Sequence, residues 1–218
     1  MDLMRQIIDW VLHVDQHLDG LIQQFGPWFY VLMFLVIFCE TGLVFTPFLP
    51  GDSLLFALGA FAARKSLSLP VVLVMIPVAA ILGDLVNYSM GRWLGPRIFR
   101  GEGLRLLNRR HLEKTQAFYE KHGRKTIILA RFVPIVRTFA PFVAGMGQMR
   151  LTRFIGFSAV AGLLWTAIFV PAGYLFADNA FVRKRFTLVM LAIIFLSILP
   201  AVFEVLRERA RARRAGVS

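Results

Sequence analysis

The feature that most constrains this chain is a set of long apolar segments that carry few charges. Leu69–Trp93 and Phe154–Phe176 each have the length that a helix needs to cross a bilayer core, about 20 residues. A further apolar run covers 186–203. Hydrophobic residues make up 57% of the 218 residues, whereas a soluble domain has about 45–50%. The sequence therefore predicts an all-α polytopic membrane protein.

The first interrupted segment, 28–63, contains two apolar runs that are each too short to span a bilayer. The run 28–39 ends before Glu40, and a second run occupies 54–63. Irregular backbone at membrane depth persists only where protein or a watery cavity satisfies its polar groups. We therefore expect a re-entrant helical hairpin over 28–63. The residues expected to break its helix are Pro47, Pro50 and Gly51.

The second half of the chain repeats this plan over 126–146, before the span 154–176. Short apolar arms at 126–130 and 142–146 enclose two arginines and two further expected helix breakers, Pro134 and Pro141. Interrupted segments at matching places in two halves are typical of transporters with internal repeats, whose binding site lies at the repeat interface. We therefore expect two re-entrant hairpins in an inverted repeat, together with spanning helices.

The remaining segments complete the expected organisation around a membrane domain at 28–178. Residues 1–27 have the spacing of an amphipathic helix, for which a position in the membrane interface and packing on the bundle are both open. The crossings place seventeen Lys and Arg on one side and six on the other, which puts the basic side, with the C-terminus, in the cytoplasm. The other expected segments are the span 69–93, a basic cytoplasmic segment 95–125, a last transmembrane helix 186–203 and a basic tail 204–218.

Composition and residue types disfavour several classes of function. The net charge is +12, but the basic residues stand in blocks between apolar runs, a pattern of membrane orientation rather than nucleic-acid binding. Cys39 is the single cysteine and has no metal-ligand spacing around it. The four histidines lie outside the apolar runs, so hydrolytic chemistry at membrane depth lacks its usual base. We expect no cofactor, no metal and no enzymatic activity.

Five charged residues stand inside the apolar segments, where a charge costs several kcal/mol, so they are the candidate functional residues. They are Glu40, Asp52, Asp84, Arg131 and Arg137. Acids in one half and arginines in the other can pair across the two halves. Such pairs have two open interpretations: salt bridges that only hold the hairpins together, or a ligand site. Arginine forks match phosphate oxygens, and broken helices add N–H groups, so a phosphate-bearing ligand gives the arrangement a physical reason.

Each candidate residue has an expected role in such a site. Arg131 and Arg137 are the predicted phosphate-binding residues, and Pro134 between them lets both turn inward. Glu40 and Asp52 are the predicted proton-coupling acids of the cavity, although Asp52 is equally suited to cap a returning half-helix. A supporting network is expected from residues at four-residue steps on one helical face, namely Asp84, Tyr88 and Arg92.

Three motifs make the sequence resemble the DedA family. They are Glu40-Thr41-Gly42 with Phe48-Leu49-Pro50-Gly51-Asp52-Ser53, then Gly83-Asp84 with Tyr88 and Gly91-Arg92, and then Arg131-Phe132-Val133-Pro134-Ile135-Val136-Arg137-Thr138-Phe139-Ala140-Pro141. The resemblance implies a bacterial inner-membrane protein that depends on the proton motive force and translocates lipid carriers, including undecaprenyl phosphate. It also implies that the acidic pair Glu40 and Asp52 and the arginine pair Arg131 and Arg137 are essential.

The expected partners are therefore membrane lipids, either a polyprenyl phosphate or a phospholipid, and protons. The sequence predicts a lipid transporter or flippase and leaves two alternatives open. A proton-coupled small-ion or drug antiporter shares the acids but does not require the arginine pair. A membrane-assembly factor requires no transport. The sequence leaves a homo-oligomeric state open.

Overall fold

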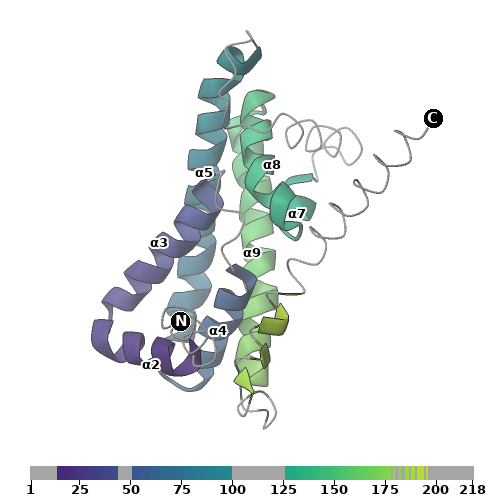
Figure 1. Ribbon diagram of the computed structural model, residues 1–218. Helices are drawn as coiled ribbons and strands as arrows, with labels where there is room; N and C mark the ends of the chain where they lie inside the picture. The colour runs from purple at the N-terminus through teal and green to yellow at the C-terminus, as the bar shows by residue number, and fades with distance from the viewer. Residues whose placement is uncertain are drawn as a thin grey trace, which may run out of the picture.

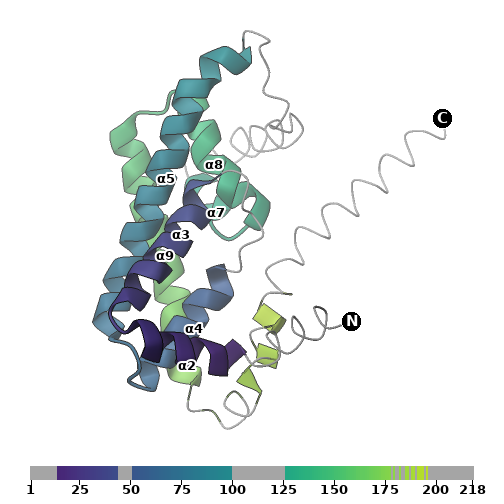
Figure 2. The ribbon, with the colours of Figure 1, turned by 60° about the vertical axis from the view of Figure 1, so that its left-hand side comes forward.

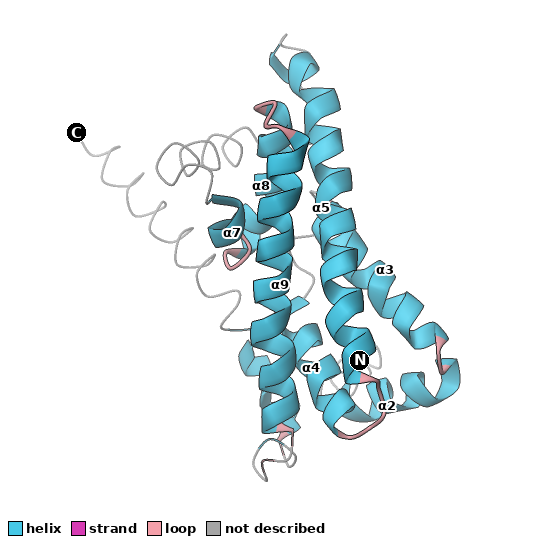
Figure 3. Cartoon of the chain, turned by 180° about the vertical axis from the view of Figure 1, so that it is seen from behind, coloured by secondary structure: helices cyan, strands magenta, loops and turns pink. Residues whose placement is uncertain are grey.

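A computed structural model describes residues 14–43, 51–99 and 126–177, with separate residues between 179 and 195. Every regular element in these ranges is a helix, as Figure 3 shows. The first half contains α2 (Val14–Phe25), α3 (Trp28–Gly42), α4 (Gly51–Ala63) and α5 (Leu69–Phe99). The second half contains α7 (Thr126–Ala130), α8 (Pro134–Met146) and α9 (Leu151–Phe176).

The two long helices, α5 and α9, run side by side in opposite directions and form the axis of the molecule (Figure 1). The stretches Leu69–Gly95 and Leu151–Phe176 are long and apolar enough to span a membrane. Only 39% of the apolar stretch in each helix is buried, and large apolar side chains such as Val74 and Leu175 are exposed. Exposed apolar faces of this length suit contact with lipid.

Two of the short helices, α4 and α8, pack on the long helix of the opposite half, whereas α3 packs on α5 and α7 on α9 in their own halves. Helix α4 packs on α9 and α8 packs on α5, and the same crossing is visible in two orientations (Figures 1 and 2). Glycines make these contacts close, because a Cβ on Gly59 would overlap the Val170 carbonyl and a Cβ on Gly173 would overlap the Phe56 carbonyl. The same reciprocal arrangement joins α5 to α8 through the pairs Gly91–Phe142 and Gly145–Tyr88.

The turns that connect each short helix to the following long helix have the same conformation. Lys65 after α4 and Gln148 after α8 have φ angles of 61° and 53°. In each turn the N–H of the next residue bonds the carbonyl five residues back, at 3.1 Å after α4 and 3.0 Å after α8. This bond is the one that closes a helix in the Schellman motif. The two halves thus share both a packing pattern and a connecting turn.

The helix bounds can be compared with the predicted segments. Helix α3 includes Glu40 and continues to Gly42, beyond the apolar run 28–39. Helix α5 continues to Phe99 and so extends into the predicted basic segment 95–125. Pro141 lies inside α8, so its prediction as a helix breaker is wrong. A proline removes one intrahelical hydrogen bond, and the close packing of α8 on α5 stabilises the helix on both sides of that loss.

Several predictions fall outside the described residues. These are residues 1–13 of the predicted amphipathic helix 1–27, the breakers Pro47 and Pro50, the segment 100–125 and the tail 204–218. Helix α2 covers most of the rest of that amphipathic helix. The described residues of the predicted last span 186–203 are 186, 188, 189, 191–193 and 195, and all are helical.

Candidate functional site

The five charged residues predicted at membrane depth meet in one cluster between the two halves. Arg137 of α8 forms ion pairs with Glu40 of α3 and with Asp52 of α4, the latter with Nη1 to Oδ1 at 3.3 Å. Asp52 lies in the first turn of α4. Glu40 and Arg137 are buried, whereas the Asp52 side chain is 17% exposed. A single arginine of the second half therefore contacts α3 and α4 of the first half.

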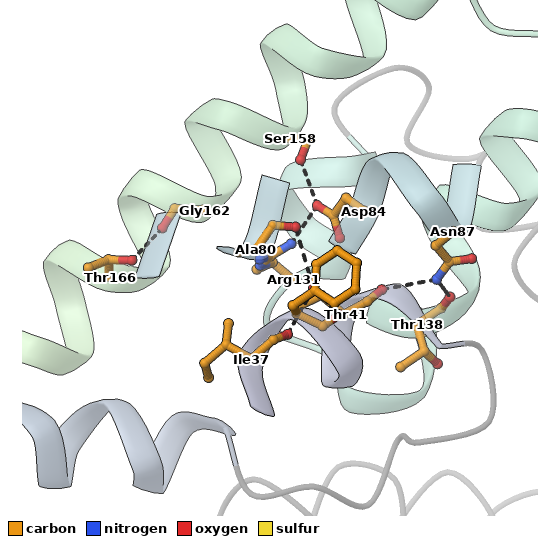
Figure 4. Close-up of polar contacts among 11 residues, drawn as sticks. Ile37, Thr41, Ala80, Asp84, Asn87, Arg131, Thr138, Ser158, Gly162 and Thr166 are labelled. Carbon is orange, nitrogen blue, oxygen red and sulfur yellow. Dashed lines mark hydrogen bonds and ion pairs between the residues drawn. The ribbon is translucent and has the colours of Figure 1, made fainter. Parts of the chain in front are cut away.

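The second arginine, Arg131, pairs with an acid on a long helix. Its Nη1 lies 2.6 Å from Oδ2 of Asp84, near the midpoint of α5, and both side chains are buried (Figure 4). Ser158 of α9 donates a hydrogen bond of 2.6 Å to the same oxygen. Asp84 is thus a direct member of the charged cluster. In the predicted supporting network of Asp84, Tyr88 and Arg92, the Nη1 of Arg92 donates a hydrogen bond of 3.1 Å to the Tyr88 hydroxyl.

The backbone break between α7 and α8 separates the two arginines. Helix α7 ends at Ala130, the residue before α8 is extended, and Pro134 occupies the start of α8. Proline suits the first helical position, since its missing N–H would have no intrahelical partner there. Six residues along one continuous helix would place the arginines about 240° apart. The break at Pro134, as predicted, allows both side chains to reach the same region.

Trp165 of α9 joins the two arginines and was not predicted as a site residue. The Cζ atoms of Arg131 and Arg137 lie over its ring at 5.0 Å and 5.3 Å from the centroid. Its Nε1–H donates to Oδ1 of Asp52 at 2.7 Å. The side chain is fully buried. Within an apolar span a tryptophan looks like any other packing residue, so the sequence carries no signal for this role.

Asn87 of α5 joins the two interrupted segments and was also missed. Its Nδ2 donates to the carbonyl oxygens of Thr41 at 3.1 Å and of Thr138 at 2.8 Å (Figure 4). These threonines directly follow Glu40 and Arg137 in the sequence. The Asn87 amide therefore fixes the backbone next to both partners of an ion pair. A polar residue one turn beyond Asp84 was the available signal.

Glycine brings α3 close to α5 beside this amide. A Cβ on Gly42 would lie 3.3 Å from Cα of Gly83, and a Cβ on Gly83 would overlap the hydroxyl of Thr41. That hydroxyl bonds back to the carbonyl of Ile37 at 3.0 Å (Figure 4). The absence of a side chain at Gly83 therefore allows α3 and α5 to pack closely here.

Several buried polar atoms of the cluster have no hydrogen-bond partner among the described residues. The N–H donors are Nε and Nη2 of Arg131 and Nε of Arg137, and the acceptors include Oε2 of Glu40 and Oδ1 of Asp84. Leaving such a group unpaired costs about 1–3 kcal/mol. The cluster thus has unused guanidinium donors and unused carboxylate acceptors in one buried place. Within the described ranges, no group of three His, Cys, Asp or Glu is arranged to hold a metal.

Comparison with known proteins places this architecture in a family. A family model described as the VTT domain matches residues 49–175, more than half of the chain. The chain belongs to the VTT-domain family, the DedA family. It is 50% identical to Protein DedA of Escherichia coli K12 over 217 residues, which is 99% of each chain. No solved structure matches.

Two further relatives extend this comparison. The chain is 43% identical to the uncharacterized membrane protein Rv0364 of Mycobacterium tuberculosis H37Rv over 182 residues, 83% of this chain and 79% of the relative. It is 33% identical to the inner membrane protein YqjA of Escherichia coli K12 over 174 residues, 80% of this chain and 79% of that protein. With the apolar spanning helices, these relatives make the chain a membrane protein of the DedA family.

Proposed function

We propose that this DedA-family chain moves a phosphate-bearing lipid across the bacterial inner membrane, with Arg131 and Arg137 binding the phosphate. The observation that carries the proposal is the set of buried guanidinium N–H groups that have no partner among the described residues. Guanidinium forks bind phosphate oxygens in pairs, so these donors suit a phosphate group. Undecaprenyl phosphate and phospholipids both present this chemistry.

The transport step is an exchange of partners at the arginines. Phosphate oxygens replace the carboxylates at Arg137 and accept hydrogen bonds from Nε and Nη2 of Arg131, which have no partner in the described part of the chain. A buried carboxylate that has lost its cation is costly, so it takes up a proton. Glu40 and Asp52 are the acids released in this exchange, because both pair with Arg137. Proton movement is thereby coupled to entry and release of the lipid headgroup.

The proposed membrane architecture has two re-entrant hairpins. Helices α3 and α4, and likewise α7 and α8, form re-entrant hairpins that enter the membrane and return. The crossed packing of short on long helices, the reciprocal glycines and the matching turns support an inverted repeat. Such a repeat can expose its central site to each side in turn by rocking one half against the other. The excess of Lys and Arg on one side supports a cytoplasmic C-terminus.

A reconstituted system tests the function directly. Purified protein in liposomes should move undecaprenyl phosphate or a phospholipid away from a membrane-impermeant probe, and Arg131→Ala/Arg137→Ala should abolish the movement. The matched control is Arg150→Ala/Arg153→Ala, which removes the same charge from two exposed arginines near the start of α9. No movement of any phosphate lipid, with or without a proton gradient, would overturn the proposal.

A conservative substitution tests the fork chemistry. Arg131→Lys keeps the positive charge but has no planar pair of donors, so lipid movement should fall about 10-fold or more. Initial rates in the same liposomes measure the effect. Wild-type rates in the lysine variant would show that a point charge suffices and would count against a fork-type phosphate site.

A further inference from the structure

Trp165 contacts three of the five charged side chains of the cluster. Both guanidinium groups lie over its ring, and its N–H donates to Asp52. The indole is fully buried on α9, whereas Arg137 comes from α8 and Asp52 from α4. One side chain of a spanning helix thus connects charged groups that come from both short segments.

Contacts through the ring face differ physically from the ion pairs. A cation over an aromatic face is attracted to the π electrons and gives up none of its N–H groups to a hydrogen bond. Arg131 and Arg137 can therefore stay on the indole while their N–H groups point to other acceptors. The Nε of each arginine has no hydrogen-bond partner among the residues that the structure describes, so such donors remain in this arrangement.

We propose that Trp165 is a positioning residue of the phosphate site, and this inference rests on the proposed function. Its ring holds the two guanidinium groups at a constant spacing while their oxygen partners change from carboxylate to phosphate. Its Nε1–H holds Asp52 next to Arg137, so this acid stays at the site when it loses the arginine. The spacing of the arginines, and with it the affinity for phosphate, depends on the indole.

A binding titration tests this role without any transport. Farnesyl phosphate, a short polyprenyl phosphate, is titrated into detergent-solubilised full-length protein, with farnesol as the uncharged control. Trp165→Leu removes the ring contacts and the N–H, and its affinity for farnesyl phosphate should fall by about 10-fold or more. Trp165→Phe keeps a ring but loses the N–H, and its affinity should fall by a smaller factor. The control Trp28→Phe changes a highly exposed tryptophan and should bind like wild type.

Fluorescence gives a readout that packing alone would not move. A variant with Trp10→Phe, Trp28→Phe and Trp93→Phe retains Trp165 as its single tryptophan. Its emission should change saturably with farnesyl phosphate but not with farnesol. The change should disappear when Arg131→Ala/Arg137→Ala is added. Thermal unfolding and size-exclusion profiles identify the variants that remain folded.

The outcomes separate this inference from the proposed function. Folded Trp165→Leu with wild-type affinity, or emission that farnesyl phosphate leaves unchanged, would overturn the positioning role. Lipids could move in liposomes while Trp165→Leu binds farnesyl phosphate like wild type and the Trp165 emission does not change. In that case the transport function stands and the positioning role of Trp165 fails. If the titrations succeed but no lipid moves, the inference stands and transport fails.

Discussion

The two arginines of the cluster lie in different surroundings. Among the described residues, Arg131 forms an ion pair with one acid, Asp84 on a long helix, and Ser158 on the other long helix donates to that acid. Arg137 faces two acids, Glu40 and Asp52, which lie on two short helices of the first half. Asp84 is 1% exposed, whereas Asp52 is 17% exposed.

This difference suggests different tasks for the two ion pairs. The acid of the Arg131 pair is held between spanning helices that pack along each other, so its surroundings are fixed. The Arg137 pairs join short helices of opposite halves, so a movement of one half against the other would separate them. Under the proposed function, the Arg137 side opens and the Arg131 side remains in place. The following substitutions test that contrast.

The largest effect is expected from Arg137→Ala. It leaves two carboxylates close together without their cation, and removing one partner of a buried ion pair costs about 3–5 kcal/mol. We expect a lower unfolding temperature in detergent and no lipid movement in liposomes.

The exchanged pair Glu40→Arg/Arg137→Glu separates the two interpretations of these ion pairs. It should recover part of the stability but no transport. Recovery of transport as well would show that the pair serves only to hold the helices together.

The next effect concerns the two acids. Asp84→Ala should destabilise the protein more than Asp52→Ala, because it leaves Arg131 without its buried acid, whereas Arg137 still has Glu40 after the loss of Asp52. For the same loss of stability, Asp52→Ala should lower the rate of lipid transport more than Asp84→Ala does. Unfolding temperatures and liposome rates measured on the same preparations check both parts. If the two variants lose the same amount of stability and the same amount of transport, the Arg131 pair and the Arg137 pairs do not have different tasks.

Asn87→Asp should have an intermediate effect. It replaces an amide that donates to two carbonyls with a carboxylate that cannot donate, at a cost of about 1–3 kcal/mol. The tie between the two interrupted segments is lost, so transport should fall with stability. Asn87→Ala removes the tie without adding a charge and is the matched comparison. If both variants unfold at the wild-type temperature, the amide does not hold the segments together.

The smallest effect is expected from Ser158→Ala. It removes one hydrogen bond to Asp84 and should cost about 1 kcal/mol. The ion pair between Arg131 and Asp84 remains, so lipid movement should stay near the wild-type rate. A loss of transport as large as that of Arg137→Ala would mean that the fixed side also takes part in the exchange.

Much of the architecture follows from the sequence because it depends on local properties. Segment length and apolar composition determine the spans 69–93 and 154–176, since a bilayer core sets a minimum helix length. Pro134 fixes the start of α8 through its missing N–H. The cost of a charge in an apolar segment identifies the five residues of the cluster. None of these properties depends on which helices are neighbours.

Only the tertiary structure decides which charged residues pair and which contacts stabilise them. The assignment of Asp84 to Arg131, and of Glu40 and Asp52 to Arg137, depends on the crossed packing of α4 on α9 and α8 on α5. Pro141 remains helical because α8 packs on α5, which local rules do not include.

Trp165 and Asn87 belong to the site through hydrogen bonds to residues between 46 and 113 positions away in the sequence. The sequence determines which groups are costly in a membrane. The three-dimensional packing determines which partners offset that cost, because an ion pair or a cation–π contact depends on distances between helices that the sequence pattern does not contain.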